Sequence, residues 1–456
     1  MGMRTFLVWV MLLAGGAPLW AASAQGPATS AYDLAACVRA ALKSDPDLDA
    51  VAADLAGARA QLAEAQAERY GQGEYTQLLG FVNEARGNVL SSPDNKNDVF
   101  KGLGPFTRLG IDLNIPVWTF GKLDAALRAA QEGVESEHAR GDTRRAEVIM
   151  RTKQLYYGLL LSRQLSLVLH DMLDTMDKAV KKTQERLDQG SSSVTELDLL
   201  KLKTGRAKFA KGVFEIDASM ELTRSALARA IGAQMGDGFD IADRKLQPVE
   251  ADIAPLTVYL AEGPPRRPEA RQLTSGIAAQ SAKLDLQEAG YYPNLFLTAG
   301  FEYATAPNRT EQTNPFVYDD FNFIRPVGVL GIRWDLNFLL TSAKVEEARA
   351  DLERLQARRR EAASGLALEI RKAYGEVTQA RNTIQASEEG RKAGRGLLVL
   401  TVSNFDLGIG EAEELFKGLG AYTEATTDYF RAVYDYNVAL AALSKAVGQE
   451  ITPLQY

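Results

Sequence analysis

The stretch that decides the fold is RLGIDLNIPVWTFGK, which runs from Arg108 to Lys122. Its apolar residues fall on alternate positions: Leu109, Ile111, Leu113, Ile115 and Val117. A period of two predicts a β-strand with one apolar face. Most of the following hundred residues instead have the composition and spacing of helix. The sequence therefore predicts a mainly helical chain that carries a small amount of strand.

Three further segments alternate in the same way, at residues 73–84, 293–303 and 327–340. Within each pair of strands, a long stretch rich in Gly, Asn, Asp and Pro predicts a loop. The positions opposite the apolar faces are polar: Asp112, Asn114, Thr298, Glu302, Arg333, Asp335 and Asn337. This alternation fits the wall of a water-filled membrane barrel, and it also fits an amphipathic sheet on a soluble core.

The predicted elements occur twice in the same order: helix, strand, loop, strand, long helix, turn, helix. Landmarks of the two copies stay in register, since Gly190 and Gly408 lie 218 positions apart, as do Tyr156 and Tyr374. We expect an internal repeat. The predicted division is a signal peptide at 1–24, a first repeat at 25–240, a linker at 241–266 and a second repeat at 267–456.

The first residues have the pattern of a secretory signal. Arg4 precedes an apolar run, and Ala22-Ser23-Ala24 matches a cleavage site, so we expect export. An alternative is a lipoprotein signal, because Leu34-Ala35-Ala36-Cys37 resembles a lipobox. We favour Cys37 as a small apolar residue of the first helix, since the apolar run ends too far upstream.

Composition excludes several classes of protein. The net charge of −7 argues against a nucleic-acid binder, and a single cysteine cannot form an internal disulfide. His138 and His170 are the only histidines, too few for a histidine-based zinc site, and we expect both on helix surfaces. No catalytic or phosphate-binding motif is found, so we expect neither an enzyme nor a cofactor. After the signal, no apolar run is long enough for a membrane helix.

Physical limits point to an assembly. The long helices, of about 65 residues, would extend roughly 100 Å and must be covered by other helices. Four strands cannot close a barrel, because about eight is the smallest number known. An open sheet in lipid would leave its edges unpaired, at high cost. If these strands meet lipid, several chains must share one barrel, and three chains would supply twelve strands.

These residues resemble the outer-membrane efflux proteins typified by TolC. The resemblance covers nearly the whole chain after the signal and is carried by four stretches: YYPNLFLTAGF, IDLNIPVWTFGK, the paired LDQG and FDLG turns, and YDYNVALAALSKAVGQEITP. It implies a homotrimer with a twelve-stranded barrel in outer-membrane lipid and a helical tunnel across the periplasm. It further implies a passive exit duct for efflux or type I secretion, which docks with a periplasmic adaptor protein and an inner-membrane transporter.

The resemblance also suggests site residues. The sixth residue after each turn glycine is acidic, Glu196 and Glu414, and the family places acidic residues there at the narrow periplasmic entrance. Asp198 lies nearby, and Lys417 stands where a second carboxylate is common, so a Glu414–Lys417 pair is an expectation. Alternatively, these carboxylates are solvated groups at helix N-termini, stabilised by the helix dipole.

The turns themselves are expected to face the adaptor. Their residues are Gly190, Ser191, Gly408 and Gly410. Glycine is also needed simply to end a helix in the left-handed conformation, so docking would be an additional role. The competing hypothesis for the whole chain is an exported helical scaffold protein of the periplasm, whose strands form a soluble sheet. The sequence does not predict the substrate.

Overall fold

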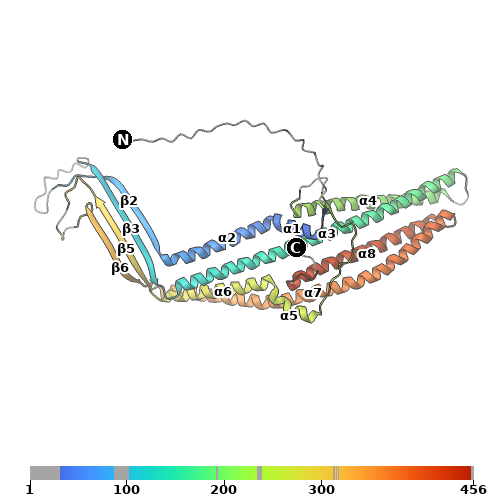
Figure 1. Cartoon of the computed structure of the whole chain (residues 1–456). Coiled ribbons are helices and arrows are strands. Elements are labelled where there is room, and N and C mark those ends of the chain that lie inside the picture. Colours follow the sequence, from blue (N-terminus) through green and yellow to red (C-terminus); the bar gives the residue numbers. More distant parts are fainter. Residues whose placement is uncertain are drawn as a thin grey trace, which may run out of the picture.

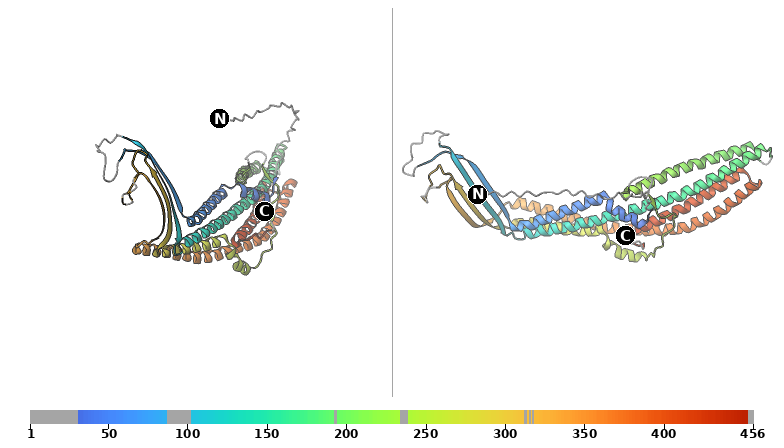
Figure 2. Two further views of the ribbon diagram at one scale, coloured as in Figure 1. Left: turned by 60° about the vertical axis from the view of Figure 1, so that its left-hand side comes forward. Right: turned by 45° about the horizontal axis from the view of Figure 1, so that its top comes forward.

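The computed structural model describes residues 31–86, 102–191, 194–233, 239–311, 314, 316 and 318–452. The predicted signal peptide and most of the predicted loop between the first two strands lie outside these residues. The molecule is elongated, with a small β-sheet at one end and a long bundle of helices extending from it (Figures 1 and 2). The prediction of a mainly helical chain with four principal strands is confirmed.

The sheet is antiparallel and has the order β2-β3-β5-β6. Its strands are β2 (Gln72–Val82), β3 (Gly104–Trp118), β5 (Asn294–Thr305) and β6 (Phe323–Arg333). Ile111 of β3 lies opposite both Tyr75 of β2 and Phe301 of β5, and Phe301 in turn lies opposite Pro326 of β6. This register places the alternating apolar residues of all four strands on one face. On the other face, Arg108 and Glu302 form an ion pair of 2.9 Å.

The fourth strand is shorter than the sequence predicted. β6 ends at Arg333 and the next helix starts at Phe338, whereas the alternation predicted strand to Leu340. A short apolar run fits either structure, and here the amide of Thr341 donates to the carbonyl of Asn337 in a helical hydrogen bond of 3.0 Å. The aromatic pair of Trp334 and Phe338, four residues apart, covers the junction.

Eight α-helices account for most of the described chain. They are α1 (Leu34–Ser44), α2 (Pro46–Ala67), α3 (Lys122–Asp188), α4 (Glu196–Ala230), α5 (Leu256–Arg266), α6 (Pro268–Glu288), α7 (Phe338–Leu407) and α8 (Ala412–Val447). Single 3₁₀ turns, η1 (Glu68–Tyr70) and η2 (Ala289–Tyr291), lead into β2 and β5. The predicted break near Pro46 is confirmed, because the Asp45 amide donates to the Ala41 carbonyl at the end of α1, while the Asp45 carboxylate accepts from the Asp47 amide at the start of α2. No helix in the described part of the chain is long and apolar enough to cross a membrane.

The two long helices organise the rest. α2 and α4 follow one another along α3, while α6 and α8 follow one another between α3 and α7 (Figures 1 and 2). Within one chain the helices therefore form a layer that is bordered by α2 and α4 on one side and by α7 on the other. The repeat is visible in this arrangement, since each long helix leaves a strand and each is followed by a shorter helix that doubles back.

The main core lies near the middle of the helical layer. Short strands β1 (Ala31–Tyr32) and β4 (Asp240–Ile241) pair there in parallel. Tyr156 is fully buried, and its hydroxyl donates to Asp243 at 2.7 Å. Cys37 is also fully buried in α1, which is the environment that we favoured for it. His138 and His170 lie on helix surfaces, as predicted, each about half exposed and 3.6 Å from an aspartate.

Candidate functional site: the helical tips

The predicted site lies at the end of the molecule that is farthest from the sheet, where two helical hairpins turn (Figure 1). The first hairpin joins α3 to α4 and the second joins α7 to α8. We call the described residues 188–191 and 194–196 the first tip and those from Leu407 to Ala412 the second tip. Both tips contain the glycines that the sequence analysis singled out.

The first tip is held by local hydrogen bonds. Gly190 has a φ of +73°, so it occupies the left-handed region that ends α3, and the Ser191 amide donates to the carbonyl of Arg186 at 3.0 Å. Asp198 and Thr195 form a capping box at the start of α4. The Asp198 amide donates to the Thr195 hydroxyl at 3.2 Å, and the Thr195 amide donates to the Asp198 carboxylate at 3.0 Å.

The second tip ends its long helix in the same way but starts the next helix differently. Gly408 has a φ of +82°, and the Gly410 amide donates to the Asn404 carbonyl at 3.1 Å. A Cβ at Gly410 would lie 3.0 Å from both the Asn404 Cβ and the Phe405 amide nitrogen, so the backbone approaches closely there. Glu411 precedes α8 without capping it through its side chain.

Just before the tips, side chains near the end of α3 bind the end of α7. Lys182 donates to the Asp406 carboxylate at 2.8 Å and to its carbonyl at 2.9 Å. Arg186 donates to the carbonyls of Asp406 and Phe405, at 2.9 and 3.4 Å. Two cations therefore satisfy carbonyls at the C-terminus of α7, where the helix dipole favours positive charge.

A second ionic link joins α4 to α8. Glu413 accepts a hydrogen bond from Lys417 at 2.8 Å and from Lys201 at 3.2 Å. These two ammonium groups lower the pKa of Glu413, with Lys417 the larger contributor. The expected Glu414–Lys417 pair is therefore not the pair that forms. Lys417 lies four residues after Glu413, a spacing that lets the two side chains meet on one helix face, and Lys201 reinforces that choice from the neighbouring helix.

The predicted gate carboxylates separate into two kinds. Asp198 is engaged in the capping box of α4, whereas Glu196 and Glu414 are exposed in the first turns of α4 and α8. The sequence analysis did not identify the ties made by Lys182 and Arg186. Only the four-residue spacing of Glu413 and Lys417 was available as a sequence signal, because pairing between helices depends on tertiary structure.

Apolar packing supports the tips. The side chains of Met176, Leu202, Phe405 and Leu415 are buried together between the four helices. Next to them, the rings of Phe209 and Phe416 make an edge-to-face contact with centroids 6.1 Å apart. Gly205 lets α4 approach closely, since a Cβ there would lie 2.7 Å from the Phe416 ring and 2.8 Å from the Met176 methyl.

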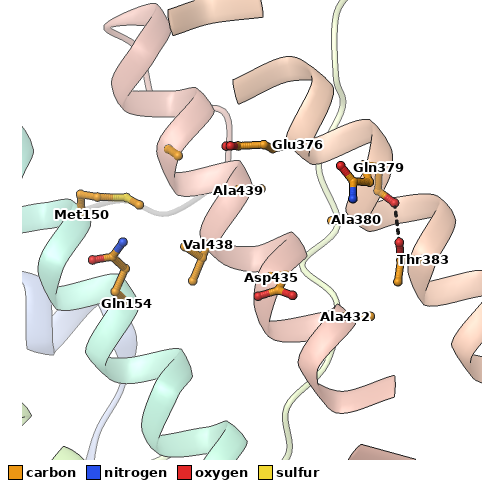
Figure 3. A pocket seen from close by; sticks show the side chains of 11 residues that line it. Met150, Gln154, Glu376, Gln379, Ala380, Thr383, Ala432, Asp435, Val438 and Ala439 are labelled. Atoms are coloured by element: carbon orange, nitrogen blue, oxygen red, sulfur yellow. Dashed lines mark hydrogen bonds between the residues drawn. The ribbon is translucent and has the colours of Figure 1, made fainter. Parts of the chain in front are cut away.

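A groove of about 450 Å³, lined by both polar and apolar side chains, lies away from the tips between α3, α7 and α8 (Figure 3). Gln154 from α3 and Asp435 from α8 project into it, beside Glu376 from α7. Burial raises the pKa of Asp435, and nearby Arg431 partly opposes that shift. In the part of the chain that the structure describes, no cluster of three or more His, Cys, Asp or Glu residues is arranged to hold a metal ion.

A comparison with known protein families shows to which family the chain belongs. The model of the outer membrane efflux protein family matches residues 37–201 and 265–449, which span both repeats. The chain belongs to this family. This outer membrane efflux protein is 24% identical over 286 residues to the fusaric acid resistance protein FusA of Burkholderia cepacia. That match covers 58% of the chain and 51% of FusA.

A second curated relative is the multidrug resistance outer membrane protein MdtP of Escherichia coli (strain K12), 25% identical over 277 residues. The alignment covers 57% of the chain and 56% of MdtP, so the chain matches about half the length of both curated relatives. The family is described as outer membrane efflux proteins, which supports an outer-membrane location.

Solved structures show the same fold over nearly the whole chain. The Campylobacter jejuni CmeC outer membrane channel superposes with a TM-score of 0.76, 15% identity and coverage of 98% of this chain and 95% of that one. The outer-membrane channel OprN gives a TM-score of 0.75 and 17% identity, with 92% and 91% covered. The expected TolC-like fold is thereby confirmed for the single chain.

Proposed function

We propose that three copies of this chain form an exit duct of a tripartite efflux or type I secretion system. In this duct the twelve strands close one barrel in the outer membrane, and the helices form a tunnel through the periplasm. The duct moves nothing by itself. Solute enters from a periplasmic adaptor and an energised inner-membrane transporter, and passes outward through the continuous pore.

The observation that carries this proposal is the exposed apolar face of an open four-stranded sheet. Leu79 and Phe81 of β2 are each 76% exposed, and Leu330 and Ile332 of β6 are 65% and 69% exposed. Large aliphatic and aromatic side chains on one face suit contact with lipid tails. The free edges of β2 and β6 would be unpaired in lipid unless each met the other edge in a neighbouring chain.

The two helices that border the helical layer, α4 and α7, also expose large apolar side chains, as the sheet does. On α4, Phe214 is 74% and Leu222 72% exposed, and on α7, Leu368 is 67% exposed. These side chains belong to opposite borders of one protomer. In a ring of three chains each border meets its counterpart, so the exposed apolar groups on both sides would be covered together with the strand edges.

The tips are proposed as the periplasmic entrance. Glu196 and Glu414 would form an acidic ring of six carboxylates that attracts cations, and the turn residues Gly190, Ser191, Gly408 and Gly410 would face the adaptor. Asp198 would support this entrance from the first turn of α4 and Lys417 from the second turn of α8. The names of FusA and MdtP associate those relatives with resistance, which supports an efflux role here.

Assembly is tested with crosslinks between strand edges. In a Cys37→Ala background, Leu79→Cys on β2 and Leu330→Cys on β6 are combined, and detergent-extracted outer membranes are treated with a bis-maleimide. We expect a covalent trimer from the double variant and no crosslinked species from either single variant. A mature chain that washes off with salt, or that runs as a water-soluble monomer without detergent, would refute the duct and favour the scaffold hypothesis.

The entrance is tested by ion selectivity in planar bilayers. Glu414→Gln should lower the preference for cations over anions, because it removes three carboxylates from the proposed ring. Glu424→Gln, an exposed position ten residues further along α8, controls for the loss of charge alone. Unchanged selectivity in Glu414→Gln would remove this residue from the entrance while leaving the assembly proposal intact.

A further inference from the structure

A second cavity, of about 340 Å³, lies at the place where α8 ends and α6 begins. Three parts of the chain line it: one face of α3 from Asp142 to Lys153, the start of α6 at 266–271, and the end of α8 with residues 448–450. None of its lining residues belongs to the tips or to the strands. The cavity lies inside one chain and is not formed at either border of the helical layer.

Two buried cationic side chains line the cavity. Lys153 has a side chain only 3% exposed, and its ammonium group lies 2.7 Å from the Glu450 carboxylate. Arg267, with a side chain 4% exposed, binds Glu269 through two hydrogen bonds of 2.9 Å and donates to the Lys445 carbonyl at 3.1 Å. Burial lowers the pKa of Lys153, although Glu450 opposes that effect. These pairs fix α3, α6 and α8 relative to one another.

Six cationic side chains line the cavity, and four of them are neutralised. Besides the two buried pairs, Arg266 binds Glu262 at 2.9 Å and Arg271 binds Asp142 at 2.6 Å. The remaining two, Arg145 on α3 and Lys445 on α8, have no ion-pair or hydrogen-bond partner for their side chains among the described residues. Glu269, the carboxylate whose charge acts on Lys445, is already held by Arg267.

Two polar side chains of the lining, Ser444 and Gln449, are hydrogen-bonded to Glu450 and Arg266. Much of the remaining lining is apolar. This apolar part consists of Ala146, Ile149 and Met150 on α3, Pro268 at the start of α6, and Ala441 on α8. A cavity that combines an apolar wall with two uncompensated cations matches a ligand with an apolar body and one negative group. Inorganic anions would leave the apolar wall in contact with water, and organic cations would be repelled by Arg145 and Lys445.

We propose that this cavity binds a small organic anion, such as an aromatic carboxylate, whose charged group is held by Arg145 and Lys445. Its apolar body lies against Ile149, Met150 and Pro268. Arginine and lysine donate charge-assisted hydrogen bonds to carboxylates, and arginine offers two parallel donors. The site belongs to a single chain, so binding does not depend on assembly into a duct.

The test compares three probes of one shape by isothermal titration calorimetry: 2-naphthoate, 2-naphthylmethanol and 2-naphthylmethylammonium. The purified full chain is used in non-ionic detergent, with protein-free micelles as the blank. We expect saturable binding of 2-naphthoate, at least about tenfold weaker binding of the alcohol, and no binding of the ammonium compound. The affinity for 2-naphthoate should fall as salt is added, because the contact is ionic.

Substitutions in the chain test whether 2-naphthoate binds in this cavity. Arg145→Gln combined with Lys445→Gln should weaken 2-naphthoate binding by at least about tenfold. The matched control, Arg39→Gln combined with Lys283→Gln, removes one arginine and one lysine from exposed positions outside the cavity and should leave binding unchanged. Ala146→Phe fills the cavity without altering charge and should also abolish binding. The proposal is wrong if 2-naphthoate does not bind, if all three probes bind alike, or if the double variant binds as the wild type does.

Discussion

The single cysteine offers a sharp test of the structure. Cys37 is fully buried in α1, and burial, with help from Asp33 and Asp243, raises the pKa of its thiol from 9.0 to about 12. At pH 8 a thiol of pKa 9 is about one-tenth thiolate, whereas one of pKa 12 is roughly one ten-thousandth thiolate. Only the thiolate is alkylated, so native Cys37 should react with iodoacetamide about a thousandfold more slowly than the unfolded chain.

The assay is alkylation at pH 8 followed by intact mass, with and without urea. A Gln189→Cys variant in a Cys37→Ala background provides the control, because this exposed tip position should react at similar rates in both conditions. Native Cys37 that reacts as fast as the control would contradict the burial of α1. Cys37 that stays unreactive in urea would mean that the sulfur is already modified, as the lipoprotein alternative requires.

Other substitutions probe the packing and turns, each measured by thermal or chemical unfolding in detergent. Tyr156→Phe removes the hydrogen bond to Asp243 and should cost about 1.5–3 kcal/mol, because the acceptor is charged. Gly408→Ala forces a side chain into the left-handed region and should cost about 1 kcal/mol, whereas Gly57→Ala, in the open interior of α2, should stabilise by about 0.5–1 kcal/mol. Arg267→Met should cost about 1.5–3 kcal/mol, since it removes charge-assisted hydrogen bonds from Glu269 and Glu369, whose side chains stay partly exposed. Above pH 9, wild type should lose stability faster than Cys37→Ala, because the folded state favours the neutral thiol and that advantage is lost as pH rises toward 12.

Local chemistry explains what could be predicted from the sequence. The strand of the opening stretch follows from strict alternation between Leu109 and Val117, and the structure has β3 there. The helix ends at Gly190 and Gly408 follow from the need for a left-handed residue, which both glycines supply. Such signals lie within a few residues of the feature that they specify, so a single sequence contains them.

Tertiary contacts explain what the sequence could not give. Lys417 had two acidic neighbours in reach, and the choice of Glu413 is reinforced by Lys201 on another helix. The contacts of Lys182 and Arg186 with the end of α7 join residues more than 200 positions apart. The rotation of one helix relative to the next determines which side chains pair. The periodicity of residues within a single helix does not specify that rotation.

At the tips, some acidic side chains are neutralised by neighbouring groups, and the others determine the electrostatic potential at the proposed entrance. Asp198 accepts hydrogen bonds from the Thr195 amide and hydroxyl, at 3.0 and 2.7 Å, so its charge is balanced locally by the start of α4. Glu413 is held by two ammonium groups and adds no net negative charge. Glu196 and Glu414 remain exposed, one from each repeat. Each hairpin therefore carries one exposed carboxylate six residues after its turn glycine, although Glu196 is the first residue of α4 and Glu414 is the third residue of α8. In an assembly of three chains, the two kinds of carboxylate would alternate around the opening.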